Sequence, residues 1–135
     1  MDLDRLNKGY AKMKIIIAGG RDFNNYNILD KVVSKIVNIE KDIIISGAAR
    51  GADSIGADWA KKHSVPLKVY PANWDRYGKS AGYIRNAEMG ENADALIAFW
   101  DGKSRGTLNM IKTMQLNKKP YRIFDYEGNE IARWP

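Results

Sequence analysis

An apolar run over residues 43–45 leads directly into a segment rich in glycine and alanine, residues 46–53, and then into a helical pattern over residues 53–63. A β-branched run favours a strand, and small residues permit the tight turn that joins a strand to a helix. Such a turn directs free backbone amides and the positive end of the helix dipole at one point, which suits a phosphate group. Arg50, inside the turn, adds a guanidinium group suited to bidentate phosphate binding. The segment therefore predicts a strand–turn–helix unit that either binds an anion or, as many glycine turns do, only packs.

Two further loops of this kind follow apolar runs. Residues 13–18 and residues 95–100 are strand-like, and the loops behind them contain glycines together with Arg21 and Arg105. The carboxyl ends of the strands in an open parallel sheet lie along one edge, where ligands bind. We therefore expect Arg21, Arg50 and Arg105 to gather around one crevice that holds a phosphate-bearing ligand.

The patterns along the chain predict an α/β fold with a mainly parallel sheet, because strand signals alternate with helix signals throughout. Strands are expected at residues 13–18, 42–46, 67–70, 95–100 and 120–126, and helices at residues 26–39, 53–63, 82–92 and 107–116. Residues 72–81 are expected to form a loop. The glycine turn at residues 127–129 predicts a hairpin into a last strand, residues 130–134, antiparallel at the sheet edge.

The length of 135 residues fits one domain, expected over residues 13–135 and preceded by a flexible extension over residues 1–12. The absence of cysteine excludes disulfides, thiolate catalysis and cysteine-ligated zinc. A single histidine, His63, argues against a histidine-rich metal site, and its place at a helix end indicates a structural role. We expect no metal and no cofactor.

The formal net charge of +6 would attract polyanions, which keeps nucleic acid open as a partner. The basic residues are scattered along the chain, however, as on an ordinary solvated surface. No apolar run is long enough for a membrane span and no secretory signal is visible, so we expect a cytoplasmic protein without membrane contact.

Four segments together resemble the YspA-type branch of the SLOG superfamily, which also contains the LOG phosphoribohydrolases and the DprA/Smf proteins. They are residues 18–23 (AGGRDF), 46–53 (SGAARGAD), 71–74 (PANW) and 84–89 (IRNAEM). The resemblance extends over about residues 13–126. It implies an open Rossmann-like sheet flanked by helices, a nucleotide or nucleotide-derived ligand at the strand ends, self-association, and a phage or mobile-element setting.

The resemblance to the LOG enzymes is incomplete at the catalytic position. Arg85 and Met89 match an arginine and a methionine of the LOG active site, but Met110 stands where those enzymes carry a catalytic glutamate. A thioether neither moves a proton nor stabilises a cationic centre. Catalysis is therefore uncertain, although other carboxylates could substitute, namely Asp22, Asp53, Glu88 and Asp101.

Aromatic and basic residues in the expected loop at residues 72–81 offer base recognition. Trp74 could stack on a purine for about 1–3 kcal/mol, with Tyr77 beside it, or it could instead anchor the loop to the core. Arg76 and Lys79 could meet further phosphates. Trp59 is expected in the core or at a subunit contact, and Trp100 in packing.

The leading hypothesis is a module that binds a nucleotide or ADP-ribose-like ligand, as a sensor, carrier or sequestering protein, and that forms a homo-oligomer. The alternatives are a LOG-type hydrolase that cleaves the N-glycosidic bond of a nucleotide and a DprA-like protein that binds single-stranded DNA. The expected ligand contacts are Gly19, Gly20, Arg21, Asp22, Ser46, Gly47, Arg50, Gly51, Asp53, Trp74, Tyr77, Arg85, Asn86, Asp101, Ser104, Arg105, Gly106 and Thr107.

Overall fold

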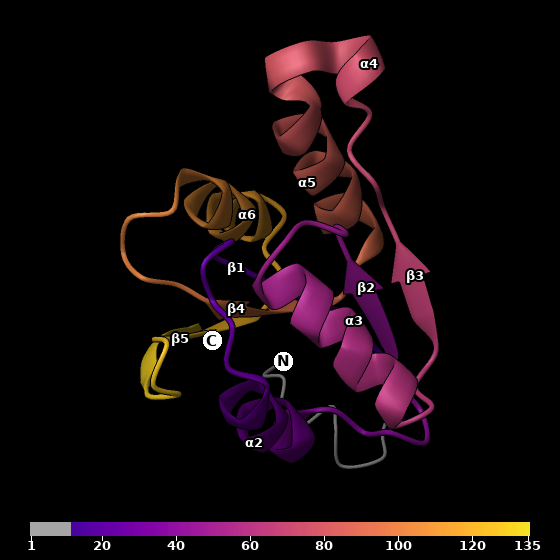
Figure 1. Ribbon diagram of the computed structural model, residues 1–135, viewed down its shortest axis with the longest axis vertical. Coiled ribbons are helices and arrows are strands. Elements are labelled where there is room, and N and C mark those ends of the chain that lie inside the picture. The colour runs from indigo at the N-terminus through magenta and orange to yellow at the C-terminus, as the bar shows by residue number, and fades with distance from the viewer. Residues whose placement is uncertain (1–11) are drawn as a thin grey trace.

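A computed structural model describes residues 12–135, in which six strands form one sheet of order β3-β2-β1-β4-β5-β6 (Figure 1). The strands are β1 (Lys14–Gly19), β2 (Ile43–Ser46), β3 (Leu67–Val69), β4 (Ala95–Phe99), β5 (Tyr121–Phe124) and β6 (Glu130–Trp134). The first five strands are parallel, and β6 pairs antiparallel with β5 as the hairpin pattern predicts. The predicted extension lies outside the described residues, apart from Lys12.

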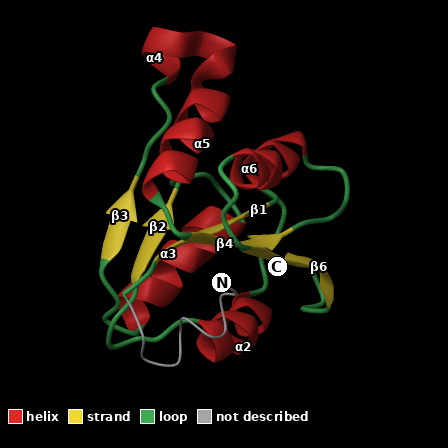
Figure 2. Ribbon diagram, turned by 180° about the vertical axis from the view of Figure 1, so that it is seen from behind, coloured by secondary structure: helices red, strands yellow, loops and turns green. Residues whose placement is uncertain are grey.

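Helices cover both faces of the sheet, which gives the predicted α/β, Rossmann-like architecture (Figure 2). They are α2 (Tyr26–Ile36), α3 (Ala52–Lys62), the short α4 (Trp74–Tyr77), the 3₁₀ turn η1 (Gly78–Ser80), α5 (Ala81–Asn92) and α6 (Arg105–Leu116). The side chains of β1 alternate between the two layers. Ile15 and Ile17 pack in the core with α2 and α3, whereas Ile16 and Ala18 pack in the core with α5 and α6.

The central strands are buried on both faces, which explains their nearly continuous apolar sequences. All five residues of β4 are buried, and Ile15, Ile16 and Ile17 of β1 are fully inaccessible to solvent. Burial of these apolar side chains therefore stabilises the sheet, and the polar residues of the βα units lie in the loops at the strand ends.

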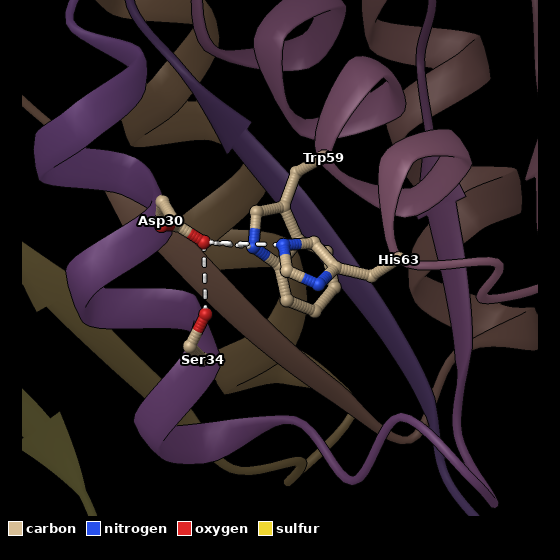
Figure 3. A network of polar contacts seen from close by, with 4 residues as sticks. All are labelled: Asp30, Ser34, Trp59 and His63. Atoms are coloured by element: carbon tan, nitrogen blue, oxygen red, sulfur yellow. Dashed lines mark hydrogen bonds and ion pairs between the residues drawn. The ribbon is translucent and has the colours of Figure 1, made fainter.

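A network of polar contacts joins α2 and α3, the two helices that cover one face of the sheet (Figure 3). The carboxylate of Asp30, on α2, accepts hydrogen bonds from Trp59 Nε1 at 2.8 Å and from Ser34 Oγ at 3.0 Å. His63 Nε2, just after α3, lies 3.2 Å from the same oxygen. The fully buried Trp59 is thus a core residue, one of the two expected positions, and His63 serves to hold α3 against α2.

Three of the differences between the predicted and the observed elements have a local structural cause. The helix expected to reach residue 39 ends at Ile36, because the buried carboxylate of Asp42 accepts a hydrogen bond from the Asn38 amide at 2.8 Å. The loop expected at residues 72–81 contains α4 and η1 instead, with Asn73 capping α4. The last helix begins at Arg105, two residues early, because the side chain of Ser104 caps it. Within residues 12–135, no helix has the combined length and hydrophobicity that crossing a bilayer requires.

Candidate functional site

The neighbouring strands β1 and β4 send the chain to opposite faces of the sheet, β1 to α2 and β4 to α6. Such a switch point leaves a crevice at the carboxyl ends of the two strands. A pocket of about 530 Å³ lies there, which we call the switch-point pocket. It is lined by Ala18, Gly19, Arg21, Asp22, Ala49, Asp53, Trp74, Lys79, Gly82, Tyr83, Arg85, Asn86, Asp101, Lys103, Ser104, Gly106, Thr107 and Met110.

The β1–α2 loop requires glycine at Gly19 because other backbone lies against it. A Cβ atom there would sit 2.7 Å from the Cβ of Ala52 and would clash with the carbonyl of Phe99. Gly51, just before α3, has φ of +79° and lies against the backbone of Arg21. These glycines bring the ends of β1 and β4 and the start of α3 close together.

The β4–α6 loop is held by its own polar side chains. The Oδ1 atom of Asp101 accepts hydrogen bonds from the amides of Lys103 and Ser104, each at 2.8 Å, and these bonds lower the pKa of the carboxyl group. The Ser104 hydroxyl in turn caps α6 by accepting from the Thr107 amide at 3.3 Å. The loop therefore presents the start of α6 to the pocket, and the space beside Gly106 is open.

Arg85 and Asn86, adjacent on α5, tie together the loops around the pocket. Arg85 Nη1 donates to the carbonyl of Gly47, and Arg85 Nε donates to Asn86 Oδ1 at 3.0 Å. Asn86 Nδ2 donates to the carbonyl of Gly106 at 3.2 Å and to Asn109 Oδ1 at 2.9 Å. One connected set of hydrogen bonds thus links the β2–α3 loop, α5 and the start of α6.

Asp53, in the first turn of α3, is a buried carboxyl group at the floor of the pocket, 5% exposed. Burial raises its pKa to about 6, and the Arg85 guanidinium and the backbone amides of Ala49, Gly19 and Gly47 partly offset that rise. The same burial, offset by Asp53, lowers the pKa of Arg85. The pocket therefore contains a carboxyl group that changes charge close to neutral pH.

The comparisons with known proteins agree with this geometry. Residues 13–77 match the sequence model of the "YspA, cpYpsA-related SLOG family". This part of the chain is similar to the YspA-related SLOG family. The predicted resemblance is confirmed, since the match contains three of its four segments in full.

Two known proteins are similar to this chain. The "Gene 61 protein" of Mycobacterium phage D29 is 37% identical over 79 residues, which cover 54% of this chain and 63% of the phage protein. The structure of DNA processing protein A (DprA) from Streptococcus pneumoniae superposes with a TM-score of 0.65 at 15% identity. That match covers 85% of this chain and half of the DprA chain, and it establishes the shared fold.

The three arginines that were expected to share one crevice do not all meet. Arg21 lines the switch-point pocket, and Arg50 instead lines a smaller neighbouring hollow that Arg21 also reaches. Arg105, the first residue of α6, is exposed and lines neither of these cavities. Arg85, another predicted contact, lines both cavities together with Arg21.

The other predicted contacts divide between the pocket wall and its support. Gly19, Asp22, Asp53, Trp74, Asn86, Asp101, Ser104, Gly106 and Thr107 line the switch-point pocket together with Arg21 and Arg85, and Gly47 lines the hollow. Ser46 is buried and donates to the carbonyl of Asp53 at 3.1 Å. Gly20, Gly51 and Tyr77 line neither cavity.

Two residues of the pocket wall, Tyr83 and Lys103, are absent from the predicted contacts, whereas Lys79 is predicted only as a further phosphate contact. Lys79 and Tyr83 lie on η1 and α5, and Lys103 lies in the β4–α6 loop. Helical spacing places Lys79, Tyr83 and Asn86 on one face, so the motif around Arg85 carried a signal for the first two. Met110, buried at 1% exposure, lines the same pocket. Within the described residues 12–135, no three histidine, aspartate or glutamate side chains are grouped as metal ligands.

Proposed function

We propose that the switch-point pocket binds a phosphorylated, nucleotide-type small molecule, and that the protein acts by holding this ligand as a sensor, carrier or sequestering protein. The observation that carries the proposal is the set of four cationic side chains on the pocket wall, Arg21, Lys79, Arg85 and Lys103. They come from four different segments and meet at the switch point, where open α/β sheets bind ligands.

The three carboxyl groups on the same wall offset only part of the positive charge of the four cationic side chains. Asp22 accepts a hydrogen bond from the Tyr126 hydroxyl, and Asp101 is bonded to the amides of its own loop. Asp53 carries a proton for part of the time near neutral pH, as its pKa of about 6 implies. By contrast, the side chains of Lys79 and Lys103 make no hydrogen bond within residues 12–135, which leaves both ammonium groups available to an anion.

A phosphate group would fit at the start of α6, beside Lys103 and the open space at Gly106. Arg85 uses Nε and Nη1 to hold the surrounding loops, and its Nη2 group makes no hydrogen bond within residues 12–135. The base would lie toward Trp74 and Tyr83, two aromatic residues of the pocket wall that are 51% and 50% exposed. The volume of about 530 Å³ lies within the range of small-molecule sites.

Isothermal titration calorimetry against nucleoside mono-, di- and triphosphates tests the proposal. We expect at least one of these to bind, and Lys103→Gln to weaken that binding about tenfold, because a charge-assisted phosphate contact is lost. Lys112→Gln is the matched control, since Lys112 is exposed on α6 and lines neither the switch-point pocket nor the hollow. Absence of binding across the panel, or equal loss in both variants, would contradict the proposal.

A second candidate is hydrolysis of the N-glycosidic bond of the bound nucleotide, and Asp53 is the observation that favours it. A buried carboxyl group with a pKa of about 6 is suited to exchange a proton near neutral pH. Chromatography of nucleoside monophosphates incubated with the protein would detect the free base, and Asp53→Asn would abolish its release. A wild-type protein that binds a nucleotide and releases no base would leave binding as the function.

Single-stranded DNA is the third ligand class, because the fold is shared with a protein named for DNA processing. The same calorimetry with a single-stranded oligonucleotide distinguishes it from a small ligand. Binding of DNA in this way would weaken steeply with added salt, since each neutralised phosphate releases counterions.

A further inference from the structure

A second hollow of about 290 Å³ adjoins the switch-point pocket, and we call it the arginine hollow. It lies on the side of the β2–α3 loop and is lined by Arg21, Gly47, Ala48, Ala49, Arg50, Pro71, Ala72, Trp74 and Arg85. Arg21, Ala49, Trp74 and Arg85 line both cavities, so the two spaces meet at these side chains. A ligand that occupied both cavities would pass beside these shared side chains.

The chemistry of the arginine hollow differs from that of the pocket. Its wall contains three guanidinium groups, from Arg21, Arg50 and Arg85, and no carboxyl group among its lining residues. The side chain of Arg50 has no hydrogen-bond partner within residues 12–135. Arg21 lowers the pKa of Arg85 further, beyond the effect of burial, because two positive charges stand close together. Three clustered arginines, with Asp53 near Arg85 as an acidic neighbour, still carry an excess of positive charge that favours the binding of an anion.

The remaining lining residues leave room for such an anion. Ala48 and Ala49 carry only methyl groups, and the Cβ of Gly47 is absent where it would approach Arg85 Nη1 to 2.6 Å. Arg21 and Arg85 line both cavities, whereas Arg50 lines the arginine hollow and not the switch-point pocket. A phosphoryl group in the hollow would thus meet Arg50, and the group linked to it in the pocket would share Arg21 and Arg85.

Building on the proposed function, we propose that the arginine hollow holds a second phosphoryl group of the same ligand. The ligand class is then a nucleoside diphosphate, or a larger molecule built on a diphosphate, in preference to a nucleoside monophosphate. The base and the first phosphate lie in the switch-point pocket, and the second phosphate lies between Arg50 and the shared arginines.

Matched pairs of nucleotides test this inference by calorimetry: AMP with ADP, GMP with GDP, CMP with CDP, and UMP with UDP. For the base that binds best, we expect the diphosphate to bind about tenfold more tightly than the monophosphate. Arg50→Gln should remove most of this preference and leave the monophosphate affinity within about twofold of wild type. Arg105→Gln, which removes the same charge from an exposed residue outside both cavities, should leave the preference intact.

The outcomes separate the inference from the proposed function. Equal affinity for both members of a pair, or an Arg50→Gln variant that weakens both members alike, would overturn the second phosphate site while nucleotide binding stands. Absence of binding to all eight nucleotides would overturn both. Tighter binding of a single-stranded oligonucleotide than of any diphosphate would assign the hollow to a nucleic-acid backbone instead. Circular dichroism verifies that Arg50→Gln is folded, which the exposure of Arg50 leads us to expect.

Discussion

Replacement of Asp53 by asparagine is expected to change how the stability of the protein depends on pH. The pKa of this carboxyl group is about 6 in the folded protein and 3.8 in its ordinary state. Between these values the unfolded chain has lost the proton while the folded chain keeps it, so wild-type stability falls as the pH rises. At about 1.4 kcal/mol for each pH unit, the full effect is about 3 kcal/mol.

About 2 kcal/mol of this effect falls between pH 4.5 and pH 7.5, because at pH 4.5 the unfolded chain is already largely ionised. Asparagine does not ionise, so the Asp53→Asn variant lacks this contribution. The free energy of unfolding of the variant minus that of wild type should therefore be about 2 kcal/mol larger at pH 7.5 than at pH 4.5, which means that the variant gains stability relative to wild type. Titration of all other groups cancels in the comparison of the two proteins.

Urea unfolding followed by circular dichroism at the two pH values measures this difference. A difference between variant and wild type that is the same at both pH values would refute the reasoning, because it would mean that Asp53 ionises alike in the folded and unfolded chains. A change of the opposite sign would mean that the Arg85 guanidinium outweighs the burial of the carboxyl group.

Three further substitutions probe the fold and the site. Asp30→Ala should lower the free energy of unfolding by about 1–3 kcal/mol, measured by urea unfolding, because the buried Trp59 Nε1 loses its acceptor. Gly19→Ala should lower the melting temperature, at a cost of about 1–3 kcal/mol, whereas Gly106→Ala, with open space around its Cβ, should change stability by less than about 0.5 kcal/mol. Trp74→Ala should weaken nucleotide binding by about 1–3 kcal/mol in calorimetry, and Trp74→Phe should retain most of it; equal loss in both would exclude stacking.

The sequence predicts the sheet well because the strands are buried on both faces and therefore read as continuous apolar runs. The prediction is wrong at the end of α2, where the spacing of Ile36 and Ile39 continues the helical pattern. The helix ends at Ile36 because the Asn38 amide donates a hydrogen bond to the carboxylate of Asp42 instead. Ile39 is consequently 49% exposed instead of buried. A hydrogen bond made by a single side chain has no periodic signature in the sequence.

The candidate site is predicted in part for a related reason. The loops that follow β1 and β4 are placed by topology alone, so their glycines and Arg21 could be assigned to the crevice. The short α4 and η1 have too few residues to show a helical period, so the sequence indicates Lys79 as a phosphate contact but not the helical turn on which it lies. Arg105 was misplaced because its loop was treated as a unit, although it is the first residue of α6 and Lys103, two residues earlier, is the one that lines the pocket.

The side-chain amide of Asn86 has a consequence for the thermodynamics of ligand capture. Through Arg85 on one side and Gly106 on the other, it joins loops that would otherwise move independently. These loops become ordered when the chain folds, so the binding of a ligand does not include the loss of conformational entropy that ordering them would require. The short α4 packs against η1 and α5 and does not take part in these hydrogen bonds (Figure 1). We therefore expect α4 to be the element that shifts when ligands of different size bind.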